Sequence, residues 1–202
     1  IMLKDYDAAL TDFQKTISLD ANFKDAYVNQ GLLQFNLKNY DAATQQFEKA
    51  LEIDSTLHMV WNNLGMIEIV KGNYQKALEL CEKSLKIQGG YAYALNNRGL
   101  AKVELGDLEG GKEDIKRSIL YDRNNAFAHR NMAICMIKEG DFEKALKALE
   151  YAQELDAKTL LINYYLGLAN SKLGNKEAAC GFWKVAIEKG EKTEIAEMKG
   201  CK

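Results

Sequence analysis

Few side chains in this sequence could carry out chemistry. The chain has four cysteines and two histidines. His58 opens a predicted helix and His129 lies in another, and no motif places a serine or cysteine nucleophile beside either. Cys81 and Cys135 stand at apolar helix positions, where a reduced thiol packs as a small hydrophobic group. No cysteine or histidine pair has the spacing of a metal site. We therefore expect no enzyme activity, no catalytic residues, no metal and no cofactor in these residues.

The other two cysteines, Cys180 and Cys201, lie near the end of the chain. Residues 176–188 are predicted to form a helix, Gly190 is a natural C-cap, and Thr193 can cap a further helix. If the chain reverses near Gly190, the two cysteines lie level with each other in an antiparallel hairpin. They then either form a disulfide that closes a loop of about 20 residues, or remain two buried thiols. We expect the disulfide.

The composition is that of a folded chain with little net charge. Apolar residues make up 47% and charged residues 28% of the chain, which is typical of globular proteins. The 27 basic residues nearly balance the 29 acidic ones, so nothing indicates nucleic acid or an anionic membrane as a partner. No apolar run approaches the ~18 residues that span a bilayer, and no signal peptide is visible. We expect no nucleic-acid partner and no membrane insertion by these residues.

A repeat with a period of 34 residues organises the chain. It is marked by small residues at Gly31, Gly65, Gly99, Ala133 and Gly167. Apolar residues recur at helical spacing on both sides of short breakers rich in Gly, Asn and Asp, so each repeat is predicted to contain two helices. The small residues let two helices approach closely. Larger residues such as Phe47 and Trp183 are expected to fill the space between neighbouring repeats.

This pattern resembles the tetratricopeptide repeat (TPR) family. The W-x2-L-G frame is met by Trp61-Asn62-Asn63-Leu64-Gly65, and the A-x3-F frame is met by Ala43 to Phe47 and by Ala9 to Phe13. The proline that is usual near the end of the TPR unit is absent throughout. The resemblance implies an all-α fold: a right-handed superhelical solenoid of antiparallel helix pairs, ending in a C-terminal capping helix.

The repeat boundaries follow from the period. Residues 1–23 correspond to the second half of a truncated unit, full units occupy 24–57, 58–91, 92–125, 126–159 and 160–192, and the capping helix is expected at 193–202. Because the chain opens on half a unit, we expect further chain upstream of Ile1.

The resemblance also implies a binding site, since the first helices of TPR units line a concave groove. The groove positions lie about half a turn from the core positions and are mainly apolar. They are Val28, Asn29, Leu32, Phe35, Met59, Asn62, Asn63, Met66, Ile69, Tyr93, Asn96, Asn97, Leu100, Phe127, Arg130, Asn131, Ile134, Tyr164 and Leu168. These side chains either meet a partner or pack between adjacent first helices. The asparagines that recur at Asn29, Asn63, Asn97 and Asn131 either bond a bound peptide's backbone or join helices of the scaffold.

The end of the chain resembles the C-termini of TPR proteins of the Bacteroidota cell envelope. The resemblance rests on Gly174, Ala179-Cys180, Phe182-Trp183-Lys184, Gly190 and Cys201. It implies the bacterial periplasm or the periplasmic face of the outer membrane, where a disulfide is stable. The cytoplasm is the alternative.

The expected function is that of a non-catalytic scaffold that binds a protein or peptide partner in the apolar groove. The setting that the resemblance implies is a hetero-complex for envelope transport, secretion or assembly. One alternative is the docking or regulatory arm of a larger enzyme or regulator, whose other domain lies upstream of Ile1. The other is a cytosolic adaptor, which reduced cysteines at 180 and 201 would favour. The groove positions lack the lysines and arginines of the Hsp70/Hsp90 carboxylate clamp, so acidic C-terminal tails are not the expected ligand.

Overall fold

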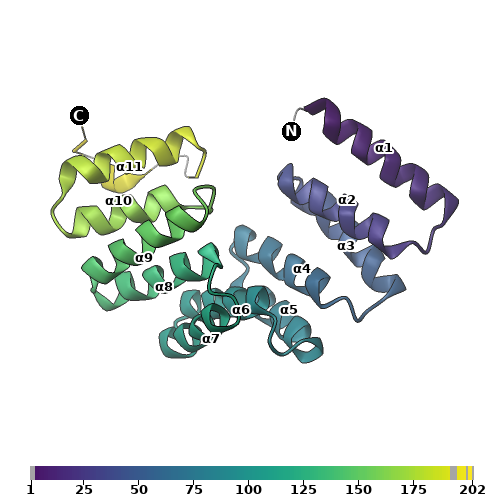
Figure 1. Ribbon diagram of the computed structural model, residues 1–202, viewed down its shortest axis with the longest axis horizontal. Coiled ribbons are helices and arrows are strands. Elements are labelled where there is room, and N and C mark those ends of the chain that lie inside the picture. Colours follow the sequence, from purple (N-terminus) through teal and green to yellow (C-terminus); the bar gives the residue numbers. More distant parts are fainter. Residues whose placement is uncertain (1–2, 192–194, 199, 202) are drawn as a thin grey trace. The chain divides into compact units, whose positions relative to one another are not determined.

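The computed structural model describes residues 3–191, 195–198 and 200–201, and it confirms the predicted all-α fold (Figure 1). The described residues contain helices and no strands. The helices are α1 (Leu3–Leu19), α2 (Lys24–Asn36), α3 (Tyr40–Ile53), α4 (His58–Lys71), α5 (Tyr74–Ile87), α6 (Ala92–Glu104), α7 (Leu108–Tyr121), α8 (Ala126–Glu139), α9 (Phe142–Leu155), α10 (Ile162–Lys172), α11 (Lys176–Glu188) and the short 3-10 helix η1 (Ala196–Met198).

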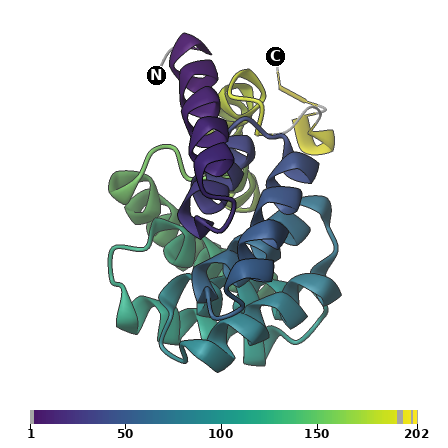
Figure 2. The ribbon, with the colours of Figure 1, turned by 90° about the vertical axis from the view of Figure 1, so that its right-hand side faces the viewer.

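The helices belong to two compact units, one ending at Ala101 and the other starting at Lys102. In the first unit, α2 packs against α3 and α4 packs against α5 as antiparallel pairs (Figure 1). Helix α1, purple in Figures 1 and 2, packs on α2. In the second unit the pairs are α8 with α9 and α10 with α11, and α9 also packs against α10. In each unit one pair rests on the first helix of the next pair, through α3 and α4 in the first unit and through α9 and α10 in the second, as expected for a repeat array.

The small residues of the repeat do allow paired helices to approach closely. A Cβ atom added to Gly31 would lie 2.6 Å from the ring of Phe47, and one added to Gly65 would lie 2.8 Å from the sulfur of Cys81. These distances are too short for carbon atoms in van der Waals contact, so a side chain at either glycine would force a shift. Phe47 is fully buried and belongs to one apolar cluster with Val60 of the next repeat. The large residue therefore packs on the small residue of its own repeat and also on the neighbouring repeat.

Glycine ends several first helices, as the breakers predict. Gly72 follows α4 and Gly140 follows α8, with φ angles of 79° and 83°. This left-handed conformation closes the helix and is readily adopted by a residue without Cβ. After α2 the corresponding conformation is taken by Lys38, with a φ angle of 61°.

An asparagine or aspartate stands before each of α3, α5, α7, α9 and α11, where such residues commonly act as N-caps, but most of them make no side-chain cap bond. Of the second helices whose N-caps the structure describes, only α7 has a side-chain cap: Asp107 accepts a hydrogen bond from the Gly110 nitrogen at 2.9 Å. Before α5, Asn73 instead donates its side-chain amide to Glu68 Oε2 of the preceding helix at 2.8 Å. The side chain turns back because the buried Glu68 carboxylate is a charged acceptor, which forms the stronger hydrogen bond.

The capping helix expected at 193–202 is not formed by the described residues of that segment. Thr193, its expected N-cap, lies outside the described residues. The described part contains only η1, while Ile195 and Cys201 belong to no helix. A helix of this length is unfavourable because nucleation must be repaid over few residues. Ile195 is instead buried, with 7% of its surface exposed, in a cluster with Trp183 of α11.

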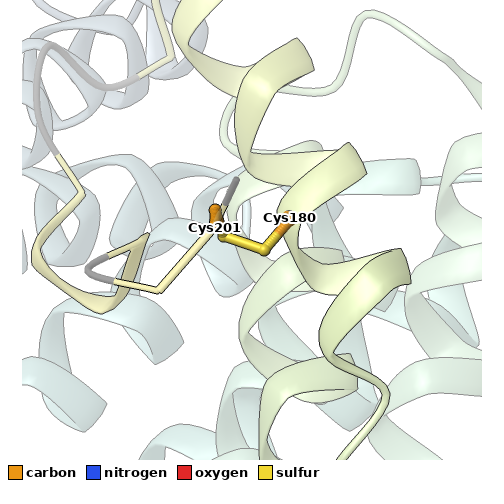
Figure 3. Close-up of a disulfide and its surroundings, with 2 residues drawn as sticks. All are labelled: Cys180 and Cys201. Carbon is orange, nitrogen blue, oxygen red and sulfur yellow. A yellow bond between two sulfur atoms is a disulfide. The ribbon is translucent and has the colours of Figure 1, made fainter.

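Cys180 of α11 is joined to Cys201 by a disulfide, with their Cα atoms 5.5 Å apart (Figure 3). After the end of α11, the carboxylate of Glu191 accepts hydrogen bonds from the Tyr164 backbone nitrogen at 3.0 Å and from the side chain of Asn163. This places a negative charge at the N-terminus of α10, where unpaired N–H groups and the helix dipole favour it. The segment after α11 therefore both covers the last helix pair and caps α10.

Candidate protein-binding surface

The predicted groove residues do not form one continuous open surface. The exposed ones are Asn29, Leu32, Met59 and Tyr93. The partly buried ones are Val28, Phe35, Asn63, Met66, Ile69, Asn97, Phe127, Tyr164 and Leu168. The buried ones are Asn62, Asn96, Leu100, Arg130, Asn131 and Ile134. For this last group the expectation of a partner-facing side chain is wrong, because neighbouring helices cover these positions.

In the first unit, asparagines of α4 and α6 are bonded to one another. Asn97 Nδ2 donates to Asn62 Oδ1 at 2.9 Å, which joins the two helices. Within each helix, Asn96 donates to Asn97 at 3.3 Å and Asn62 donates to Asn63 at 3.4 Å. The chain of amides satisfies the buried Asn62 and therefore belongs to the scaffold. The partly buried Asn63 stands at its end, and no acceptor for its side-chain nitrogen lies among the described residues.

In the second unit, Arg130 occupies the repeat position that Asn62 holds in the first. Its Nε and Nη2 donate to Asn131 Oδ1 at 3.0 and 2.6 Å, and its Nη1 donates to the Leu160 carbonyl at 2.5 Å. Burial lowers the pKa of Arg130 to about 10. The guanidinium lies 5.5 Å from the centre of the Phe127 ring. Arg130 thus ties α8 to the turn before α10, and this part of the predicted groove is internal structure.

The first unit keeps large apolar side chains at the surface of its first helices. Met59 is 48% exposed, Tyr93 is 44% exposed and Leu32 is 39% exposed. Met59 and Tyr93 stand at the same repeat position, near the starts of α4 and α6. Met66 and Asn63 lie on the same face of α4 as Met59, because the spacings of four and seven residues return to one side of a helix. We call Leu32, Met59, Asn63, Met66 and Tyr93 the first-helix patch.

Two aromatic neighbours of this patch were not singled out by the sequence. The Tyr91 ring lies 5.7 Å from that of Tyr93 and makes an edge contact, at 4.8 Å between centroids, with His58. Burial raises the pKa of the Tyr91 hydroxyl. Tyr91 lies in the turn before α6, where helical periodicity gives no signal. Tyr91 thus contacts both His58 and the patch residue Tyr93.

A cleft adjoins the patch between α1 and α2. Its volume is about 420 Å³, and Tyr6 and Phe13 of α1 face Asn29 and Leu32 of α2 across it. Two predicted groove residues therefore do line a hollow, and both belong to the first unit.

Among the described residues, the free cysteines are buried and His129 is bonded to a backbone carbonyl. Within the described ranges, no three His, Cys, Asp or Glu residues lie close enough to hold a metal ion. Cys81 and Cys135 are buried free thiols, and burial raises the pKa of Cys135 to about 11, which keeps it protonated. The ring of His129 bonds the Arg123 carbonyl at 2.8 Å, as a packed histidine does. None of the described helices is long and apolar enough to cross a membrane.

Comparison with known protein families identifies the family of the chain. Tetratricopeptide repeat patterns match residues 25–57, 58–91 and 92–125, which together make up half of the chain. The chain belongs to the tetratricopeptide repeat family. TPR units generally serve as non-catalytic modules of protein–protein interaction. A comparison with curated proteins gave no significant match.

Solved structures with the same fold include several TPR proteins. One is YrrB, described as a TPR protein with an unusual peptide-binding site, with 23% identity and a TM-score of 0.57 over 88% of this chain and 92% of that one. Another is TTC0263 of Thermus thermophilus, with 22% identity and a TM-score of 0.72 over 84% and 92% of the two chains. The type IV pilus biogenesis factor PilW has 19% identity and a TM-score of 0.72 over 97% and 90%. At these identities the likeness concerns the fold.

Proposed function

We propose that this TPR chain is a non-catalytic scaffold that holds a segment of a partner protein on the first-helix patch. The proposal rests on the exposure of two large apolar side chains at the same position of successive repeats. Met59 is 48% exposed and Tyr93 is 44% exposed. Large apolar side chains gathered on a surface mark interaction sites. Methionine adapts to different shapes, and tyrosine is enriched in protein interfaces.

The patch also offers one polar anchor for a main chain. Asn63 lies one helical turn from Met59, and its side-chain nitrogen is a donor without an acceptor in the described residues. A carbonyl of a bound segment would supply that acceptor, and apolar side chains of the segment would contact Met59 and Tyr93. The expected ligand is therefore an apolar stretch of polypeptide, helical or extended, with an accessible carbonyl. The peptide-binding site named for YrrB, a protein of the same fold, agrees with this class of ligand.

The proposed setting is a hetero-complex of the bacterial envelope that acts in transport, secretion or assembly, at the periplasm or the periplasmic face of the outer membrane. Two observations support it. The Cys180–Cys201 disulfide suits an oxidising compartment. The fold is shared with PilW, whose description is that of a type IV pilus biogenesis factor.

Two other functions remain as alternatives with distinct signatures. A docking or regulatory arm of a larger enzyme would be joined to a catalytic domain upstream of Ile1. A cytosolic adaptor would carry reduced thiols at Cys180 and Cys201 in protein taken from its native compartment.

The test is site-specific photo-crosslinking in the native host. A photoreactive amino acid replaces Tyr93 in one strain and the exposed Lys86 of α5 in a control strain. We expect one partner to be linked through position 93 and not through position 86. Met59→Glu should abolish that crosslink while the helix content by circular dichroism stays the same, because a charge would be placed in the apolar contact. A crosslink that survives Met59→Glu, or none at position 93, would reject the patch as the binding surface.

A further inference from the structure

The first unit has a second hollow on the opposite side of α4 from the first-helix patch. It has a volume of about 560 Å³ and is bounded by α3, α4 and α5. Its lining residues include Trp61, Leu64 and Glu68 of α4. On a helix these three positions lie about half a turn from Met59, Asn63 and Met66. We call this hollow the Trp61 cleft.

The floor of the cleft is apolar, and its polar groups are satisfied. Leu64 and Leu80 form it together with the ring of Trp61, whose N–H donates to the Ser55 carbonyl at 2.9 Å. Glu68 is 4% exposed at the base. Its burial would raise its pKa, but hydrogen bonds from Asn73 and from Lys76, at 2.8 and 3.0 Å, outweigh this and lower it. The floor is therefore complementary to apolar side chains of a ligand, and its polar groups already have hydrogen-bond partners.

The two walls carry opposite charges. On α3, Glu48 and Glu52 line the cleft, both exposed, and Glu48 has no ion-pair or hydrogen-bond partner in the described residues. On α5, Lys76 and Lys83 line it. Lys83 is exposed, with its ammonium 4.5 Å from the centre of the Trp61 ring and no carboxylate bonded to it in the described part of the chain. Glu48 and Lys83 thus present opposite, unneutralised charges from facing helices.

The combination of the charged walls with the Trp61–Lys83 pair is not constant among the repeats. Two repeats further along the chain, Lys116 stands where Glu48 does, and Leu120 stands where Glu52 does. His129 replaces Trp61, and Tyr151 replaces Lys83. One repeat further along, Glu82 and Arg117 keep the two charges while Leu95 replaces Trp61, so the Trp–Lys pair, and not the pair of charges, is particular to this cleft.

We propose that the Trp61 cleft is a second docking site, whose occupant is an amphipathic α-helix of a partner protein with basic side chains along one edge of its apolar stripe and acidic side chains along the other. Helical walls expose side chains and no unpaired backbone groups, so an extended segment would find no main-chain partner there. A helix satisfies its own backbone and inserts only side chains. Its basic edge meets Glu48 on α3, and its acidic edge meets Lys83 on α5.

Synthetic helices test the charge pattern directly. The probe is a stapled, fluorescein-labelled 18-residue helix with a leucine stripe, lysines along one edge and glutamates along the other. Two companions have the same leucines with glutamates along both edges or lysines along both. Anisotropy titrations with the whole chain should show the mixed helix binding roughly ten-fold more tightly than either companion, with the advantage reduced by salt. Equal affinity of the three peptides would overturn the proposal.

Charge reversals on the protein locate the contact. Glu48→Lys and Lys83→Glu should each weaken the mixed helix by about five-fold or more, because an attraction becomes a repulsion. Glu82→Lys and Lys86→Glu make the same charge changes at exposed positions of α5 outside the cleft lining, and should leave binding unchanged. Tyr93→Glu should also leave it unchanged, which separates this site from the first-helix patch. Loss of binding with Tyr93→Glu, or retention with both cleft variants, would place the peptide elsewhere and reject the proposal.

Discussion

Removing the Cys180–Cys201 disulfide should destabilise the second unit and leave the first unit unaffected. The bridge spans 21 residues of chain. The loop-closure entropy that it removes from the unfolded state corresponds to about 3 kcal/mol for a loop of this length. Among the described residues of the segment that it holds, Ile195, Met198 and Cys201 pack on the last helix pair. The segment's own contacts are therefore few, and the bridge should supply much of its stability.

The two tryptophans make this measurable unit by unit. Trp61 belongs to the first unit, and Trp183 of α11 packs beside Ile195 in the second. In a Trp61→Phe background, Trp183 fluorescence followed in urea reports on the second unit alone. With a slope of about 2 kcal/mol per molar, Cys201→Ser should lower the midpoint by about 1.5 M. In the reciprocal Trp183→Phe background, the Trp61 transition should not respond to Cys201→Ser.

The control separates the bridge from the serine substitution. Once the bridge is absent, replacing Cys180 as well should cost little more, so the double variant should resemble Cys201→Ser. A reducing agent should shift the parent protein and leave the double variant unchanged. An unchanged midpoint in Cys201→Ser, or equal sensitivity of parent and double variant to reductant, would refute the reasoning.

Three further predictions concern the scaffold. Gly31→Ala should destabilise the first unit by about 1–3 kcal/mol in urea, because the new methyl group meets the Phe47 ring, and adding Phe47→Leu should recover part of the loss. Cys135 should resist iodoacetamide at neutral pH until the chain unfolds, since burial raises its pKa to about 11; rapid labelling of the folded protein would contradict this. The ion pair with Lys24, at 2.5 Å, and a hydrogen bond from Thr56 hold the pKa of Asp54 well below its ordinary 3.8. A lowered pKa stabilises the fold above that value, so the contribution should be lost as the pH falls below about 4, and Asp54→Asn should remove this pH dependence from acid titrations of the first unit.

The repeat allows the fold to be predicted from the sequence. It predicts the binding surface only in part. The 34-residue period locates each helix pair, because Gly31 and Gly65 must face Phe47 and Cys81 wherever the chain repeats. The same period marks Met59 and Arg130 alike as partner-facing, although Met59 is exposed and Arg130 is 6% exposed. Periodicity indicates on which face of its own helix a side chain lies. It does not report whether an adjacent helix or turn covers that direction.

The C-terminal segment was also only partly predictable from the sequence. The sequence left Cys180 and Cys201 either as a disulfide, which we expected, or as two thiols, and the structure joins them in a disulfide. The secondary structure of the segment before Cys201 could not be predicted from the sequence. Whether it forms a helix or a short 3-10 turn that buries Ile195 depends on tertiary packing rather than on local preference.

By itself, the sequence determined the class of fold, the repeat register, the close helix contacts and the absence of familiar catalytic motifs. These depend on spacing within one or two helices, which the order of residues contains. Tertiary structure alone decided that Asn62 and Asn97 bond each other, that Arg130 is internal, and that Trp61 borders a cleft between an acidic and a basic helix. Each of these depends on side chains from separate helices, and their distances arise only when the helices pack.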